Sequence, residues 1–148
     1  DFEFYKFPNL SDLINYDERF FRKLNFGFRA AYLVNFIQKV KKGFDLNLLE
    51  HLDSYKAREE LMKIKGIGYK IADCILLYSC GKYDCFPIDR WIKKVITVHY
   101  SNLLGEKLNI NEKNYLKICK IFNEKFNNLA GFAQLYLYMY SRNSFKQL

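Results

Sequence analysis

The spacing of apolar residues is helical over most of this chain. One stripe at i, i+3, i+4 and i+7 is formed by Ala30, Leu33, Val34 and Ile37, and the period returns at Ile92–Ile96 and Tyr115–Phe126. Such spacing gives each helix one apolar face, and strand-like alternation is scarce. With only 2 prolines and 7 glycines, the sequence predicts an all-α fold. We expect a compact bundle of orthogonal helices forming a single domain over residues 1–148.

The pattern predicts helices near residues 11–15, 17–24, 28–42, 46–52, 55–64, 69–80, 89–100, 111–127 and 131–145. The residues expected to begin helices as N-caps are Ser11, Asp17, Ser54 and Asp89. Gly43 and Gly81 are expected to end helices.

The composition narrows the functional class. The formal net charge is +8, which favours a polyanionic partner such as nucleic acid, although a lysine-rich proteome would produce the same excess. The cysteines at positions 74, 80, 85 and 119 lack the C-x-x-C spacing of metal sites, so neither a metal nor another cofactor is expected. No apolar stretch approaches a membrane span. We expect reduced thiols and a cytoplasmic protein, associated with the nucleoid if the source is a prokaryote.

The most informative segment is a glycine turn between two expected helices. Gly66 and Gly68 flank Ile67, which can enter the core and fix the turn. The glycines allow unusual backbone angles and close approach of a ligand, and the first amides of the next helix can hold a phosphate oxygen. The segment predicts a helix-hairpin-helix motif that holds the DNA backbone. The alternative is a plain turn with two glycines.

Lys70 lies in the first turn of the helix that follows the hairpin. The partial positive charge at a helix N-terminus disfavours a cation there, and an amine must lose its proton to act as a nucleophile. Lys70 is therefore a candidate nucleophile, and the alternative is a simple phosphate contact.

Asp89 follows a stiff segment that contains Pro87. As an N-cap it would be held rigidly, with one carboxylate oxygen left to face a cleft. An ordinary cap is the simpler interpretation. The hypothesis is that Asp89 faces Lys70 across a groove.

Five segments in order resemble the helix-hairpin-helix superfamily of DNA glycosylases, and within it the 8-oxoguanine DNA glycosylase/lyases. They are Phe7–Leu10, Leu24–Tyr32, Gly66–Cys74, Phe86–Asp89 and Leu129–Gln134, which match the family patterns F-P-x-L, L-G-x-G-Y-R-A-x-Y, the hairpin with its lysine, V-P-V-D and Y-A-G-x-A-Q. The resemblance covers nearly the whole chain. It implies base excision repair of an oxidised purine in double-stranded DNA by a monomeric enzyme.

The resemblance also implies roles for single residues. Lys70 would attack the sugar carbon C1′ and form a Schiff base, and Asp89 would assist departure of the base. Gln134 would read the edge of the extruded base, and Cys74 and Tyr138 would lie against its faces.

Contacts with the duplex are implied as well. Arg29 would hydrogen-bond the orphaned partner base, and Phe28 would wedge into the stack. Gly66, Gly68, Tyr69 and Arg90 would contact the backbone. Arg90-Trp91 departs from the family pattern after the aspartate, which puts one phosphate or pocket contact in doubt.

The family's full-length members also carry an N-terminal part that this sequence lacks, so we expect a C-terminal catalytic fragment. Two alternatives to the 8-oxoguanine glycosylase/lyase stay open: a non-catalytic DNA-binding module, and a glycosylase/lyase for another lesion.

Overall fold

The computed structural model describes residues 3–105 and 109–144, and within them all regular structure is helical. The elements are α1 (Leu10–Leu13), α2 (Glu18–Lys23), α3 (Arg29–Lys41), α4 (Leu48–His51), α5 (Ser54–Met62), α6 (Tyr69–Cys80), α7 (Arg90–His99), α8 (Ser101–Leu104), the 3-10 turn η1 (Glu112–Asn114), α9 (Tyr115–Lys125) and α10 (Ala130–Ser144). The all-α prediction is confirmed. No helix in this part of the chain is long and apolar enough to cross a bilayer.

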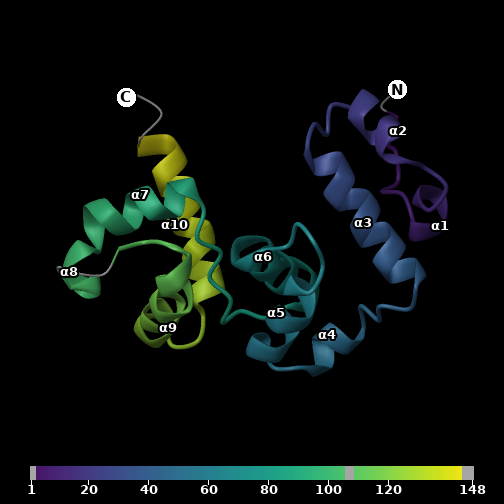
Figure 1. The fold of residues 1–148 in the computed structure, drawn as a ribbon. Helices are drawn as coiled ribbons and strands as arrows, with labels where there is room; N and C mark the ends of the chain where they lie inside the picture. Colours follow the sequence, from purple (N-terminus) through teal and green to yellow (C-terminus); the bar gives the residue numbers. More distant parts are fainter. Residues whose placement is uncertain (1–2, 106–108, 145–148) are drawn as a thin grey trace.

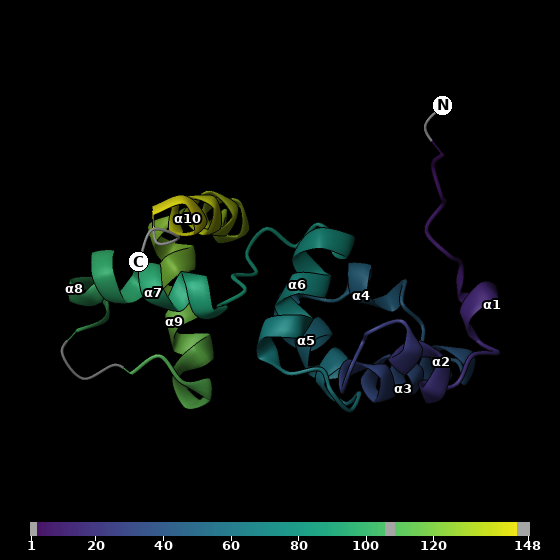
Figure 2. The same cartoon turned by 90° about the horizontal axis from the view of Figure 1, so that it is seen from above.

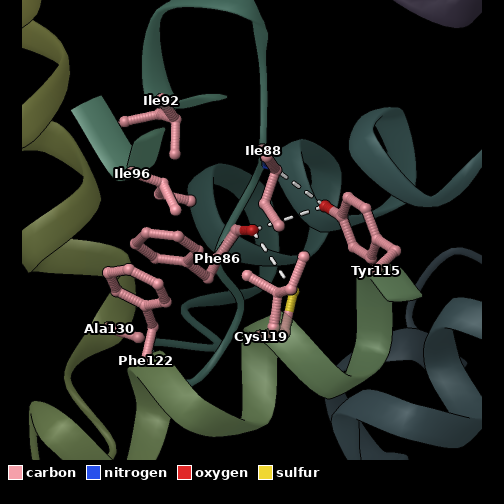
Figure 3. Packing of buried hydrophobic residues seen from close by; sticks show 9 residues of the cluster. Phe86, Ile88, Ile92, Ile96, Tyr115, Cys119, Phe122 and Ala130 are labelled. Atoms are coloured by element: carbon pink, nitrogen blue, oxygen red, sulfur yellow. Dashed lines mark hydrogen bonds between the residues drawn. The ribbon is translucent and has the colours of Figure 1, made fainter. Parts of the chain in front are cut away.

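The helices form three groups in a row, and each group has its own apolar core. Figures 1 and 2 show α1–α3 at one end, α4–α6 in the middle and α7–α10 at the other end. Phe21, Ala30 and Ile37 form the first core. A second core joins α4, α5 and α6, and a third surrounds the stacked rings of Phe86 and Phe122, seen in Figure 3. A site that combines residues of α6, α7 and α10 therefore draws on two groups of helices with separate apolar cores.

Two of the expected N-caps are confirmed. Asp17 accepts a hydrogen bond from the backbone of Phe20 at the start of α2, and Asp89 caps α7. Gly81 ends α6 in the left-handed conformation, with φ 63°, as expected of a C-terminal glycine.

The other two expected caps are wrong. Asn9, not Ser11, lies at the N-cap of α1. Asp53, not Ser54, caps α5, because the Ser54 hydroxyl instead donates to Asp84 Oδ1 at 2.6 Å. That long-range partner removes Ser54 from local capping.

Candidate active site

The glycine turn joins α5 to α6 as a hairpin. Gly66 has φ +97°, and a methyl group there would overlap the Tyr32 ring of α3 and lie 2.7 Å from Tyr32 Cβ. Ile67 is half-buried against the α4–α6 core, as predicted. Gly68 differs from the expectation, because its φ of −101° and ψ of −177° are open to any residue. Any need for glycine at position 68 therefore comes from the space that a missing side chain leaves, and not from the backbone angles.

The N-terminus of α6 is open to a ligand. Gly68 is the N-cap and supplies no capping side chain, so the first amides of the helix lack an intrahelical partner. A methyl group at Gly68 would meet no other atom of the described residues within 4 Å. Lys70 and Lys93 line the same shallow hollow of about 240 Å³. Glu112 lines the hollow as well, so the free amides and Lys93 are the groups that suit a phosphate oxygen.

Tyr69, the first residue of α6, packs against α9. Its ring stacks on Tyr115 of α9, with centroids 5.1 Å apart and planes inclined by 16°. The ring is half-buried, so it is fixed by packing, with part of its surface left to contact a ligand.

One face of α6 carries two of the predicted site residues, Lys70 and Cys74. Lys70, Cys74 and Tyr78 follow each other at intervals of four residues, so they project from the same side of the helix. Burial raises the pKa of the Cys74 thiol, the Lys70 ammonium opposes that rise, and the Asp89 carboxylate adds to it. On this face Cys74 follows Lys70 by one helical turn.

Asp89 is held rigidly at the start of α7. Its Oδ1 accepts hydrogen bonds from the backbone amides of Trp91 and Ile92 at 2.9 and 2.8 Å. Residues 85–88 before it are buried. In the described part of the chain no donor bonds the other carboxylate oxygen, and the side chain is half-buried. The cap thus fixes Asp89 while leaving one oxygen available to a ligand.

Gln134 and Tyr138 reach this region from α10. Gln134 is 4% exposed, and its Oε1 accepts a hydrogen bond from the Tyr78 hydroxyl at 3.3 Å. Burial raises the pKa of Tyr78, and the nearby Cys74, Asp89 and Tyr138 raise it further. Of the three predicted pocket residues, Gln134 bonds Tyr78, Cys74 lies one turn before Tyr78 on α6, and Tyr138 lies one turn after Gln134 on α10.

Sequence reasoning missed Tyr78. The signal was present, since Tyr78 continues the interval of four residues from Lys70 through Cys74. In the structure it is 58% exposed and is the residue that links α6 to Gln134.

Phe28 and Arg29 lie apart from this face. Phe28 precedes α3 and is 64% exposed, and the Arg29 guanidinium lies 4.8 Å from its ring centroid. Both residues line an apolar cleft of about 670 Å³ together with Gly66 and Ile71. Neither Lys70 nor Cys74 lines this cleft.

Arg90 is placed beside Asp89. It is exposed at the first position of α7, and its guanidinium lies 4.9 Å from the centroid of the Trp91 ring. Within residues 3–105 and 109–144, no three histidine, cysteine, aspartate or glutamate side chains form a group that could hold a metal ion.

Comparison with known proteins finds similar DNA glycosylase/lyases. The probable N-glycosylase/DNA lyase of Methanothermobacter thermautotrophicus is 30% identical over 123 residues, which cover 83% of this chain and 37% of that protein. N-glycosylase/DNA lyase OGG1 of Arabidopsis thaliana is 33% identical over 144 residues, covering 93% of this chain and 39% of the relative. The 8-oxoguanine glycosylase/lyase of Clostridium acetobutylicum, solved with double-stranded DNA containing cytosine opposite 8-oxoguanine, superposes with a TM-score of 0.82 at 35% identity.

Over 83% to 95% of its length the chain is similar to DNA glycosylase/lyases, consistent with the helix-hairpin-helix superfamily that its motifs resemble. The Clostridium match covers 95% of this chain and 46% of the solved structure. The chain thus spans less than half the length of the relatives that it matches. No family model matches the sequence.

Proposed function

We propose that this chain is the catalytic portion of a bifunctional DNA glycosylase and AP lyase that removes 8-oxoguanine from duplex DNA. The observation that carries the proposal is that Lys70 lies one turn before Cys74 on the face of α6 that bonds Gln134 through Tyr78, while Asp89 caps α7 with one carboxylate oxygen left for a ligand. A nucleophile and a carboxylate beside one pocket suit displacement of a base from a sugar. The relatives named above are glycosylase/lyases, which supports this reaction class.

In the proposed first step the neutral Lys70 amine attacks C1′ of the damaged nucleotide. The new N–C1′ bond forms as the bond between C1′ and the base breaks, and the base leaves with the bonding electrons and gains a proton. The ionised Asp89 carboxylate stabilises the positive charge that develops on the sugar.

In the second step the sugar ring opens and the covalent adduct becomes an imine. Loss of a proton from C2′ then expels the 3′ phosphate by β-elimination, and hydrolysis of the imine releases Lys70. An enzyme of this kind without the lysine would use water and would leave the strand intact. Lys70 is therefore the residue that argues for lyase activity.

The base must leave the duplex before Lys70 can reach its sugar. We assign its pocket to Cys74, Gln134 and Tyr138. Gln134 is buried and accepts a hydrogen bond from the Tyr78 hydroxyl, which suits an amide that reads one edge of a base. The half-buried thiol and ring of the other two residues suit contact with its faces.

The duplex partner is assigned to two surfaces. The open amides after Gly68 and the turn at Gly66 suit a phosphate of the damaged strand, and we assign Tyr69 and the exposed Arg90 to the same strand. The exposed pair Phe28 and Arg29 suits insertion beside the vacated position. We assign a monomer as the active form. The four cysteines are free, which suits the reducing compartment that holds chromosomal DNA, the cytoplasm in a prokaryote.

Borohydride trapping on duplex DNA with 8-oxoguanine opposite cytosine tests the proposal. Reduction of the imine gives a stable protein–DNA crosslink, which we expect for the wild-type chain and not for Lys70→Gln. The matched control is Lys117→Gln, which removes the same charge from an exposed position on α9 and should crosslink like the wild type.

Three outcomes would change the assignment. Binding of the duplex by the wild-type chain without any crosslink would favour the non-catalytic DNA-binding module. A crosslink that survives in Lys70→Gln would assign the nucleophile to another amine. Crosslinking to a different damaged base, in a panel of lesions, would keep the chemistry and change the substrate.

A further inference from the structure

A buried polar cluster lies between α5, α6 and α9, beneath the proposed site. Its centre is Asp73, which is fully buried, and its cation is Arg58, which is 7% exposed. Arg58 Nε donates to Asp73 Oδ1 at 2.7 Å, and Arg58 Nη2 lies 3.7 Å from Cys85 Sγ. The ion pair therefore touches both α6 and the segment that leads to Asp89.

Tyr115, at the start of α9, extends this cluster. Its hydroxyl donates to Asp73 Oδ2 at 2.8 Å and accepts a hydrogen bond from the Ile88 amide at 3.3 Å. Because a hydroxyl has one proton, Asp73 takes that donation, and the Phe86 carbonyl lies 3.3 Å away. Figure 3 shows the Tyr115 hydroxyl facing the backbone of Phe86 and Ile88. The Cys119 thiol donates to the Phe86 carbonyl.

The two ends of this chain of contacts lie next to the proposed catalytic residues. Asp73 is three positions after Lys70 on α6, and Ile88 directly precedes Asp89. We infer that Asp73 and Tyr115 are positioning residues, which hold the Asp89 segment at a set distance and direction from the helix that carries Lys70. Their effect on catalysis rests on the function proposed above, whereas their effect on the backbone at Ile88 does not.

Physical reasons favour positioning over simple stabilisation. The α4–α6 and α7–α10 groups have separate apolar cores, and apolar packing is not directional. A buried ion pair adds little net stability, since desolvation offsets its attraction. Hydrogen bonds in a buried cluster have fixed lengths and angles. The Tyr115 hydroxyl also stays protonated, because burial and the adjacent Asp73 raise the pKa of this phenol.

Amide hydrogen exchange tests the backbone effect without any need for activity. Tyr115→Phe keeps the ring that stacks on Tyr69 and removes only the hydroxyl. We expect the Ile88 amide to exchange about tenfold faster or more, along with the cap amides of Trp91 and Ile92. The control is Ile118→Val, a fully buried change on the same helix that touches no hydrogen bond and should alter exchange evenly. Exchange at Ile88 that is equal in the two variants would overturn the inference.

The catalytic effect is tested by single-turnover excision, at a temperature where every variant is folded. We expect Tyr115→Phe to lower the excision rate about ten- to hundredfold with little change in DNA affinity, and Ile118→Val to react like the wild type. If Tyr115 acts through Asp89, the double variant Tyr115→Phe/Asp89→Asn should be no slower than Asp89→Asn alone.

The possible failures are distinguishable. Additive losses in the double variant, or an equal loss in Ile118→Val, would reduce Tyr115 to a structural residue. A wild-type chain that excises nothing would count against the proposed function alone, because hydrogen exchange at Ile88 would still decide the positioning.

Discussion

Alanine substitution of the two hairpin glycines should have different effects. Gly66→Ala should lower the stability of the fold, whereas Gly68→Ala should lower the affinity for DNA. Gly66→Ala introduces a methyl group at φ +97°, against the root of the Tyr32 ring. A non-glycine residue at such an angle costs about 1–3 kcal/mol, and overpacking adds about 1–3 kcal/mol. We expect a loss of about 2–6 kcal/mol in the free energy of unfolding.

Gly68→Ala should leave the fold nearly unchanged. The backbone at Gly68 is extended, and the new methyl group would meet no other described atom within 4 Å. We expect a cost below about 1 kcal/mol, because the residue is exposed and its backbone angles suit alanine. The methyl group would, however, lie where a phosphate approaches the amides of α6. Loss of one charge-assisted hydrogen bond would weaken DNA binding about ten- to hundredfold.

Urea unfolding followed by circular dichroism measures the first effect, and fluorescence anisotropy with a labelled duplex measures the second at fixed salt. The reasoning would be refuted if Gly66→Ala were as stable as the wild type, since Tyr32 would then have no fixed position against the turn. Wild-type DNA affinity in Gly68→Ala would place the phosphate elsewhere.

Two further predictions concern Tyr78 and the buried thiols. Tyr78→Phe removes the hydroxyl that donates to Gln134 Oε1. Loss of this hydrogen bond, worth about 0.5–1.5 kcal/mol, should change the relative excision rates of different damaged bases about two- to tenfold. Unchanged relative rates would contradict a role of Tyr78 in base recognition. Burial and the charge of Asp73 raise the pKa of Cys85 from 9.0 to about 12, so this thiol's contribution to stability is complete below pH 9 and is lost as the pH rises toward 12. In urea unfolding between pH 8 and 11, we expect the free energy of unfolding to fall above pH 9 by on the order of 1 kcal/mol per pH unit from this group. The fall should be smaller in Cys85→Ala, and equal slopes in the two proteins would count against the prediction.

The sequence by itself predicted the hairpin, the family resemblance and the described helices other than the short α8 (Ser101–Leu104). These follow from local terms: an apolar stripe every three to four residues, a glycine at a required turn, and a carboxylate at a helix start, as at Asp89. Even the row Lys70, Cys74 and Tyr78 was readable from its spacing. Local reasoning failed where a distant partner competed, as when Asp84 took the Ser54 hydroxyl and left Asp53 as the cap.

Only the tertiary structure decided which side chains meet. Tyr78 bonds Gln134 across 56 positions, and Asp73 bonds Tyr115 across 42. The tertiary structure also gave the two glycines different surroundings, because Tyr32 of α3 packs against Gly66 and leaves Gly68 open. The physical reason is that such contacts depend on how three separately cored groups of helices pack, which no short stretch of the sequence specifies.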